Sequence, residues 1–360
     1  MYVMRMRRVC GNSSFLGLLA VACGSRTGLV EGPVGPVDDG SAPAHEAGVD
    51  AGGADVIDEE IGSESGTDAA ECPSGLVTLA SGQGGPGAIA VDGTSVYWSD
   101  NYSGRIMKVG LCGGTPTILA EAPGAPQDIA VDTSSVYWVN GSTVMKVPLN
   151  GGTPTTFVSD QGNPSSIAVT SSTLYWTDWN SGAVAKMPIG GGTPVTIATG
   201  QISPSSIAVD AISAYWTDGD VGTILKVALD GGTLITLASG QSEPADLAID
   251  AMNVYWTNED SNSVVKVPLS GGVPTTLASG HGEPFGIVVD PTGVYWPAGD
   301  PFPCHDDGGG CGAVVKEALG GGTPTTLASI AGGAVSLAVD ATSLYWVNIS
   351  IGSVMKLTPK

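Results

Sequence analysis

The sequence predicts an all-β protein, a seven-bladed β-propeller with four antiparallel strands in each blade, from three observations. A Tyr-Trp pair recurs seven times between residues 97 and 346, with a spacing close to 40 residues in every repeat except the last. The 360 residues include 54 Gly and 24 Pro but only 13% charged residues, a composition typical of short strands joined by tight turns. Each repeat also contains four strand-like segments, and four-stranded repeats of this length are typical of propeller blades.

The repeat at 244–279 shows the order of these segments. It reads "PADLAIDAMNVYWTNEDSNSVVKVPLSGGVPTTLAS". We predict strand A at 247–250, strand B at 253–256, strand C at 264–269 and strand D at 275–279. An Asp-led turn follows strand A, a polar loop follows strand B, and a Gly-Gly turn follows strand C.

The strand count predicts how the ring closes. Strands A, B and C occur seven times, but the chain stops after the last strand C. The segment "LVTLAS" at 76–81 precedes the first strand A and matches the D strands at 275–279 and 325–329. We therefore expect the last blade to take its outer strand from 76–81, which would leave no unpaired edge in the ring.

The aromatic pairs are explained by the shape of the gaps between blades, which widen outward from the axis. Strand A carries a small residue in most blades, and strand B, one step further out, supplies Tyr and Trp on opposite faces. Strand C carries one lysine in each blade, near the Tyr-Trp pair. We expect its stem to cover ring surface and its ammonium to meet a carboxylate, with a basic binding ring as the alternative. These residues are Lys108, Lys146, Lys186, Lys226, Lys266, Lys316 and Lys356.

The acidic and amide residues of the turns have a structural and a metal-binding interpretation. Six turns after strand A begin with Asp, at 92, 132, 210, 250, 290 and 340, and Thr170 stands at the third turn. Asp, Asn and Thr in such positions commonly cap their own turn, and we favour this over metal binding.

The N-terminus predicts export. Arg5, Arg7 and Arg8 precede an apolar run at 15–22 that is too short to span a bilayer, which needs about 20 residues. We expect a signal peptide at 1–22 and lipidation of Cys23, and simple secretion is the alternative if Cys23 stays unmodified. Residues 23–71 would then form a disordered acidic linker, with twelve Asp or Glu against Arg26 between 24 and 71, and 72–360 the propeller. The protein would be located in the cell envelope, as an outer-membrane or surface lipoprotein.

Net charge narrows the possible partners. The chain carries a formal charge of −22, which repels nucleic acid and anionic membrane surfaces. We expect no nucleic-acid partner, no contact with the membrane except through the lipid anchor, and a monomer. The expected partner is a protein, peptide or carbohydrate at the cell surface.

The cysteines of an exported chain suggest two disulfides. Cys304 and Cys311 lie in a ten-residue insertion in blade six and would close that loop. Cys72 and Cys112 stand at equivalent positions before the outer strands of neighbouring blades. Their pairing would staple the closure, but whether the two lie within reach of each other stays open.

Two groups of residues are ligand-binding candidates. The first is the ring of residues just before each strand A, where Asp128 and Asp246 stand among small residues. These two acids could hold a polar ligand or a divalent cation on the axis. The alternative is that they are solvated acids beside a water-filled channel. The second comprises residues that break the repeat on the face formed by the D-to-A and B-to-C loops, because exposed aromatic residues there suggest recognition, with packing at the rim of the blades as the alternative. They are Trp179, His281, Phe285 and His305, with Tyr102 and Phe302 beside them. No catalytic residue, cofactor or metal site is predicted.

The motif "YWTD" at 175–178 and 215–218 resembles the YWTD propellers of lipoprotein receptors and the broader group of NHL-like bacterial propellers. The likeness extends over about 73–360 and implies the fold. Receptor modules have six blades and this chain has seven, and Pro297-Ala298 replace Thr-Asp in blade six, so receptor-type recognition does not carry over. We expect a non-enzymatic binding module. The alternative is a metal-dependent enzyme resembling virginiamycin-B-lyase-like or gluconolactonase-like propellers, with an axial site.

Overall fold

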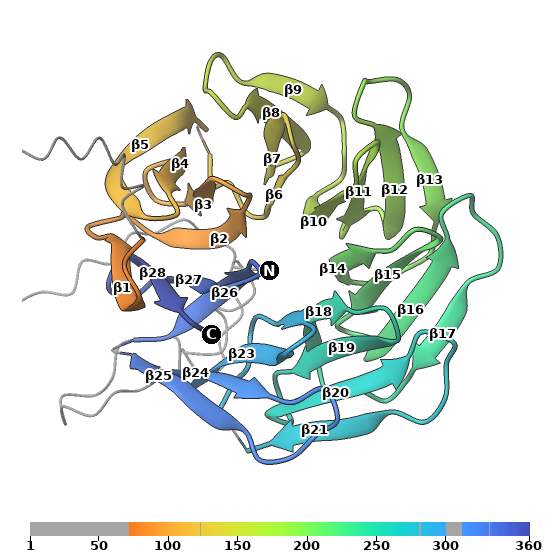
Figure 1. Ribbon diagram of the computed structural model, residues 1–360. Helices are drawn as coiled ribbons and strands as arrows, with labels where there is room; N and C mark the ends of the chain where they lie inside the picture. Colours follow the sequence, from red (N-terminus) through yellow and green to blue (C-terminus); the bar gives the residue numbers. More distant parts are fainter. Residues whose placement is uncertain (1–71, 123, 281, 300–311, 331) are drawn as a thin grey trace, which may run out of the picture. The chain divides into compact units, whose positions relative to one another are not determined.

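The computed structural model describes residues 72–360 except 123, 281, 300–311 and 331. The predicted signal peptide, Cys23 and the acidic linker therefore lie outside the described residues, as do Cys304 and Cys311. The described part belongs to a compact unit, Ala70–Lys360. It contains seven separate four-stranded antiparallel sheets arranged as blades around an axis, which confirms the predicted fold (Figure 1).

The strands follow the predicted order in every blade. The inner strands are β2 (Pro86–Val91), β6 (Ile129–Val131), β10 (Pro164–Val169), β14 (Pro204–Val209), β18 (Pro244–Ile249), β22 (Val288–Asp290) and β26 (Ala334–Val339). The second strands are β3 (Ser95–Asp100), β7 (Ser135–Asn140), β11 (Thr173–Asp178), β15 (Ser213–Asp218), β19 (Asn253–Asn258), β23 (Gly293–Gly299) and β27 (Leu344–Asn348). The third strands are β4 (Arg105–Gly110), β8 (Thr143–Pro148), β12 (Ala183–Pro188), β16 (Thr223–Ala228), β20 (Ser263–Pro268), β24 (Gly312–Glu317) and β28 (Ser353–Thr358). The outer strands are β5 (Gly113–Glu121), β9 (Thr155–Val158), β13 (Val195–Ala198), β17 (Ile235–Ala238), β21 (Thr275–Ser279), β25 (Thr325–Ile330) and β1 (Gly75–Ala80).

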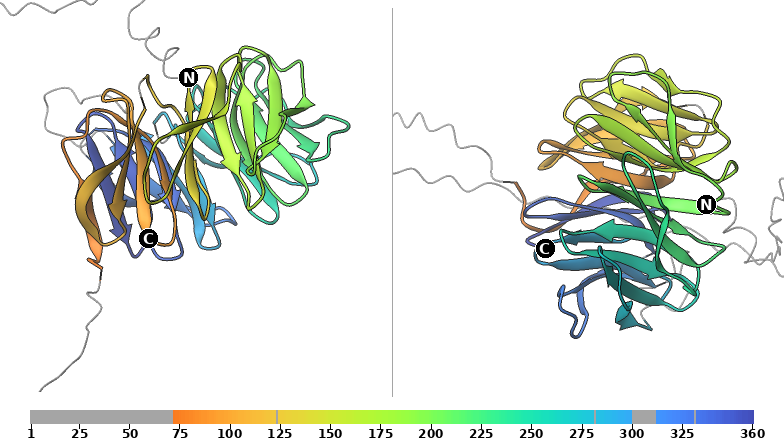
Figure 2. Two further views of the ribbon diagram at one scale, coloured as in Figure 1. Left: turned by 90° about the horizontal axis from the view of Figure 1, so that it is seen from above. Right: turned by 90° about the vertical axis from the view of Figure 1, so that its right-hand side faces the viewer.

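Blades 1 to 6 are numbered from β2–β5 to β22–β25, and blade 7 comprises β26, β27, β28 and β1. Seen from the side, the strands run between two faces of the ring (Figure 2). We call the face with the D-to-A and B-to-C loops the loop face, and the face with the Asp-led and Gly-Gly turns the turn face. Backbone hydrogen bonds join neighbouring loops of the loop face, as from Trp179 N to Asn163 O at 3.0 Å.

Blade 7 closes as the sequence predicts. β1 pairs antiparallel with β28, with Leu76 opposite Leu357 and Val77 opposite Lys356, and the strand begins one residue earlier than predicted. A disulfide joins Cys72 to Cys112, whose Cα atoms are 4.5 Å apart, which answers the question that the sequence left open. It ties the start of β1 in blade 7 to the turn between β4 and β5 in blade 1, so the two ends of the ring are linked both by a sheet and by a covalent bond.

The Tyr-Trp pairs fill the gaps between blades. Trp138 of blade 2 packs in one apolar cluster with Tyr97 of blade 1, and Trp98 packs with Tyr345 of blade 7 across the closure. The same exchange occurs at the other five gaps. The Trp side chains of the seven Tyr-Trp pairs are all fully buried. One aromatic residue from each neighbouring blade therefore fills each gap, as predicted.

The strand C lysines lie beside the aromatic rings, but the prediction of a carboxylate partner is wrong for five of them. The ammonium group of Lys108 lies 5.3 Å from the Tyr97 ring centre and donates to the Leu149 carbonyl of the next blade at 2.9 Å. In these five blades the turn after strand C of the neighbouring blade brings a backbone carbonyl to the position where a side-chain carboxylate was expected. The other four pairs are Lys186–Leu229, Lys226–Leu269, Lys266–Leu319 and Lys356–Leu111.

The turn aspartates cap their turns, as predicted. Asp92 Oδ1 accepts hydrogen bonds from the backbone N–H groups of Thr94 (2.7 Å) and Ser95 (2.8 Å), and its Oδ2 accepts the Tyr97 hydroxyl at 2.8 Å. Burial opposes ionisation, but these hydrogen bonds lower the pKa of Asp92. Burial raises the pKa of Tyr97 to about 12, and the hydrogen bond from its hydroxyl to Asp92 adds to this effect. The aspartate therefore fixes both the turn and the tyrosine of the Tyr-Trp pair. We call the Tyr and Trp residues that fill the gaps between blades the wedge residues.

Candidate axial and loop-face sites

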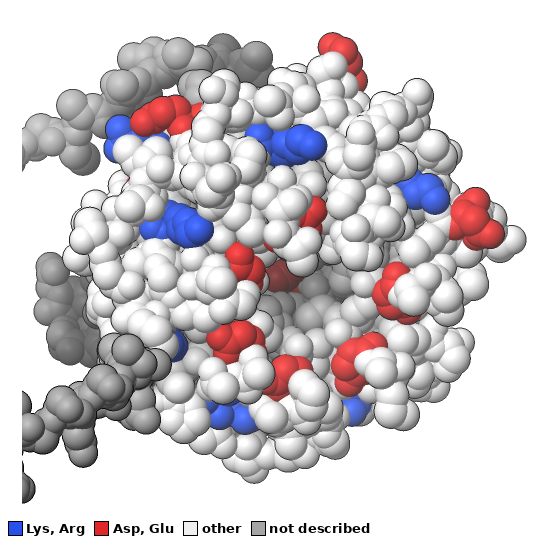
Figure 3. Space-filling model, turned by 45° about the horizontal axis from the view of Figure 1, so that its top comes forward, with Lys and Arg blue, Asp and Glu red and all other residues white. Residues whose placement is uncertain are grey.

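The two axial acids lie at the inner end of their blades. A register irregularity between Pro244 and Leu247 places Asp246 within β18, and Asp128 comes just before β6. The predicted ring before strand A is therefore partly inside the strand, because the first residues of most A strands are bulged. Figure 3 shows Asp and Glu side chains gathered around a hollow at the centre of the ring, with Lys and Arg further out.

Asp128 joins blade 2 to blade 3. Its Oδ2 accepts the Ser166 hydroxyl at 2.7 Å and the Ile167 backbone N–H at 2.9 Å, while Oδ1 accepts the N–H of Ile129 at 2.8 Å. Burial is the main influence on this carboxyl and raises its pKa, although the three hydrogen bonds act in the opposite direction. The carboxylate thus satisfies backbone and hydroxyl donors of two blades at once.

Asp246 joins three blades in the same manner. Its Oδ1 accepts the Ser206 hydroxyl of blade 4 at 2.5 Å and the N–H of Leu247 at 2.9 Å, and its Oδ2 accepts the N–H of Ile287 of blade 6 at 3.0 Å. Burial, together with repulsion from Asp128, raises the pKa of Asp246 to about 6. A carboxyl that titrates near neutral pH could exchange a proton on the axis.

Both acids are partly exposed, and each also accepts three hydrogen bonds within or between blades. They are therefore held in place by the blades while keeping some contact with solvent. In the part of the chain that the structure describes, no group of three or more His, Cys, Asp or Glu side chains could hold a metal ion.

The loop-face candidates have different outcomes. Trp179 is half-buried, and its indole N–H donates to the Ser203 hydroxyl at 2.6 Å, which fixes the ring beside the loop that enters blade 4. The expected exposure of Phe285 is wrong, because its side chain is only 5% exposed. His281 and His305 lie outside the described residues.

Exposed apolar residues mark one part of the loop face that the sequence did not single out. Ile202, in the loop before β14, is 64% exposed, and Val221, in the loop between β15 and β16, is 46% exposed. Both loops belong to blade 4, and the Ile202 N–H donates to Asp218 at the end of β15. Trp179 borders this region through Ser203. We call Trp179, Ile202 and Val221 the apolar loop patch.

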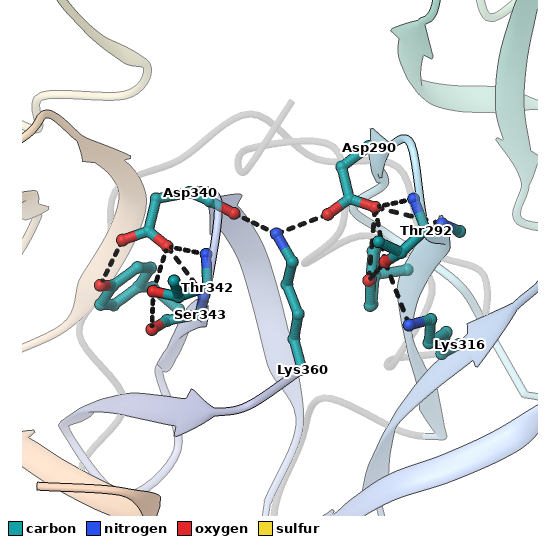
Figure 4. Close-up of polar contacts among 10 residues, drawn as sticks. Asp290, Thr292, Lys316, Asp340, Thr342, Ser343 and Lys360 are labelled. Atoms are coloured by element: carbon teal, nitrogen blue, oxygen red, sulfur yellow. Dashed lines mark hydrogen bonds and ion pairs between the residues drawn. The ribbon is translucent and has the colours of Figure 1, made fainter.

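The turn face carries a different arrangement at its blade 6 and 7 turns. Lys360 lies between two Asp-led turns, where its ammonium pairs with Asp290 and donates to the backbone carbonyl of Asp340 (Figure 4). Burial opposes the change, but the Lys360 contact lowers the pKa of Asp290, followed by the N–H and hydroxyl of Thr292. This contact holds the residues after β28 against the turns of blades 6 and 7.

A set of glutamines in the D-to-A loops also binds the wedge tryptophans, which was not predicted from the sequence. In four blades the wedge Trp donates its indole N–H to a Gln in the preceding D-to-A loop, as from Trp176 to Gln161 at 3.0 Å. The recurring Gln of these loops was a visible signal for it. The other pairs are Trp98–Gln83, Trp216–Gln201 and Trp256–Gln241.

Comparisons with known proteins show the fold. No protein-family model matches the chain, and no curated protein matches it. A streptogramin B lyase structure is similar with a TM-score of 0.63 and 13% identity, covering 78% of this chain and 96% of that one. A nidogen/laminin complex gives 0.52 and 22% over 63% of this chain and 90% of that one. The WD40 β-propeller domain of Doa1 gives 0.66 and 14% over 81% and 98%. The protein is therefore a β-propeller repeat protein, and its neighbours include a lyase, a protein complex and a WD40 propeller domain.

No helix among the described residues is long and apolar enough to cross a membrane.

Proposed function

We propose that this protein is an exported, non-enzymatic binding module that recognises a protein or peptide through the apolar loop patch. The observation that carries the proposal is the pair of exposed aliphatic side chains, Ile202 and Val221, beside a tryptophan held in place by Ser203. Exposed apolar groups cost free energy in water, and ordered Trp side chains are common anchors of protein interfaces. The flanking loops are fixed by backbone hydrogen bonds, so little order would have to be gained on binding.

Export and anchoring form part of the proposal. The disulfide between Cys72 and Cys112 is consistent with an oxidising compartment. Lipidation of Cys23 would attach the chain to a membrane, and residues 24–71 would act as a tether. Mass spectrometry of the mature N-terminus tests this, because an unmodified Cys23 would mean secretion without an anchor.

The binding test uses the full chain on an array of random 15-residue peptides. We expect retained peptides whose affinity falls at least about tenfold for Ile202→Ser and for Trp179→Ala. Ile212→Ser is the matched control, because Ile212 is 71% exposed but lies on the turn face. Equal loss in all three variants, or no retained peptide while a glycan array is bound, would contradict the proposal.

An axial enzyme of the lyase type is the second candidate. Asp246 favours it, because a carboxyl with a pKa near 6 can serve as a general base. Asp128 and Asp246 are the acids that could contact a divalent cation there, but both are engaged in hydrogen bonds between blades. Elemental analysis of purified protein distinguishes the two functions: a stoichiometric divalent ion that is lost in Asp128→Ala would support the enzyme.

A further inference from the structure

Blade 3 contains a pocket of about 360 Å³ beside its wedge tryptophan. The buried residues Trp176 and Ala185 form part of its wall, and Asp178 contributes a carboxylate. Asp160 and Thr196, both exposed, lie at its edge. The seven blades are near copies of one another, so the other blades act as an internal reference for what differs around this pocket.

The first difference from the other blades is a small residue in the middle of β12. Ala185 occupies the position just before the strand C lysine, where every other blade has a larger apolar residue: Met107, Met145, Leu225, Val265, Val315 and Met355. In blade 2 the equivalent Met145 sulfur accepts a hydrogen bond from Thr156 of the outer strand at 3.5 Å. Thr196 is paired with Ala185 in the sheet and makes no side-chain hydrogen bond among the described residues, so its hydroxyl is available to a ligand.

The second difference is an aspartate in a position that favours glycine. Asp160 has a φ of 60°, and the equivalent loop residues of four other described gaps are glycines with φ between 67° and 80°: Gly82, Gly200, Gly240 and Gly280. A side chain costs roughly 1–2 kcal/mol in this left-handed region, although Asp tolerates it better than most residues. The loop before blade 3 therefore accepts a cost in backbone free energy at Asp160, the residue that places a carboxylate at the edge of the pocket.

The electrostatics of the pocket favour a cation. Asp178 accepts three backbone N–H groups, from Gly162, Asn163 and Ser181, which hold its buried carboxyl in place in the wall. Asp160 is exposed, and its Oδ2 accepts the Ser159 hydroxyl at 2.8 Å. No described Lys or Arg lines the pocket. A positive ligand group would thus meet two carboxylates without a competing cation of the protein.

We propose that this pocket binds a primary ammonium group on a short apolar stem, as in a small alkylamine or an exposed lysine side chain. The ammonium would lie near Asp160, with the Thr196 hydroxyl as an acceptor, and the stem would lie over Ala185. This site goes beyond the proposed function. It uses the loop before blade 3 and the strands of that blade, whereas Ile202 and Val221 of the apolar loop patch lie in loops of blade 4.

The test measures binding of n-butylammonium to the full chain by saturation-transfer NMR, with n-butanol as the uncharged probe. We expect saturable binding of the ammonium and at least tenfold weaker binding of the alcohol. Ala185→Met fills the pocket with the residue of three other blades and should weaken ammonium binding at least tenfold. Asp160→Gly restores the residue of the other loops, cannot strain the backbone, and should weaken it at least threefold.

Two controls separate this site from general attraction and from the peptide site. Asp220→Asn removes one exposed charge from blade 4 and should leave ammonium binding unchanged, and so should Val221→Ser in the apolar loop patch. Binding that is insensitive to both Ala185→Met and Asp160→Gly, or equally weakened by Asp220→Asn, would overturn the proposal. A blocked Gly-Lys-Gly tripeptide then distinguishes the source: loss of its binding in the same two variants assigns the site to lysine side chains, and binding of the free amine alone assigns it to small amines.

Discussion

Removal of the disulfide between Cys72 and Cys112 should measurably loosen the closure of the ring. The bond spans 40 residues and fixes the start of β1, the strand that completes blade 7, to blade 1. In the chain-entropy model, a cross-link that closes a loop of this size stabilises the folded chain by about 4 kcal/mol. In the double variant Cys72→Ser, Cys112→Ser, only packing and the pairing with β28 would hold β1.

The assay is guanidinium chloride unfolding followed by tryptophan fluorescence, which reports on all seven buried wedge residues. We expect the unfolding midpoint of the double variant to fall by an amount equivalent to about 4 kcal/mol, with strand β28 losing protection from hydrogen exchange first. A midpoint within about 1 kcal/mol of wild type, with β28 still fully protected, would refute the reasoning that the disulfide stabilises the closure.

Two further predictions concern single side chains. Because burial raises the pKa of Asp246 to about 6 from 3.8, its stabilising contribution is complete below pH 4 and is lost as the pH rises through 6. The free energy of unfolding of wild type minus that of Asp246→Asn should therefore fall between pH 4 and 7, by at most about 3 kcal/mol, and a rise would contradict the assigned direction. Lys226→Met keeps an apolar stem over the Tyr215 ring but leaves the Leu269 carbonyl without its donor. Thermal unfolding should therefore show a loss of about 1.5–3 kcal/mol in the free energy of unfolding, with peptide binding unchanged. Unchanged stability with lost binding would restore the alternative of a basic binding ring.

Much of the fold could be predicted because the period is long and each repeat is complete. The Tyr-Trp spacing sets the number of blades, and a spare outer strand at 76–81 predicts how they close. The boundaries of the A strands were less predictable. They begin earlier than predicted in most blades, since bulges such as that between Pro244 and Leu247 lengthen them.

The candidate sites were harder to predict because repeat position does not give side-chain partners. Phe285 breaks the repeat as Trp179 does, yet it is buried while Trp179 packs on Ser203. The strand C lysines were correctly placed near the rings, but their carbonyl partners belong to the next blade. The exposed residue Ile202 gave no signal, because a single aliphatic residue in a loop is common in any sequence.

The sequence by itself determined the number of blades, the strand order, the closing strand and the residues that fill each wedge, because these follow from a repeated pattern of residue size and turn chemistry. The tertiary structure alone decided what happens between blades. Only there do Cys72 and Cys112 come within bonding distance, Asp246 reaches donors of two neighbouring blades, and Asp160 and Ala185, 25 positions apart in the chain, border one pocket. Contacts of that kind depend on how adjacent sheets twist and bulge against each other, and no single repeat encodes this.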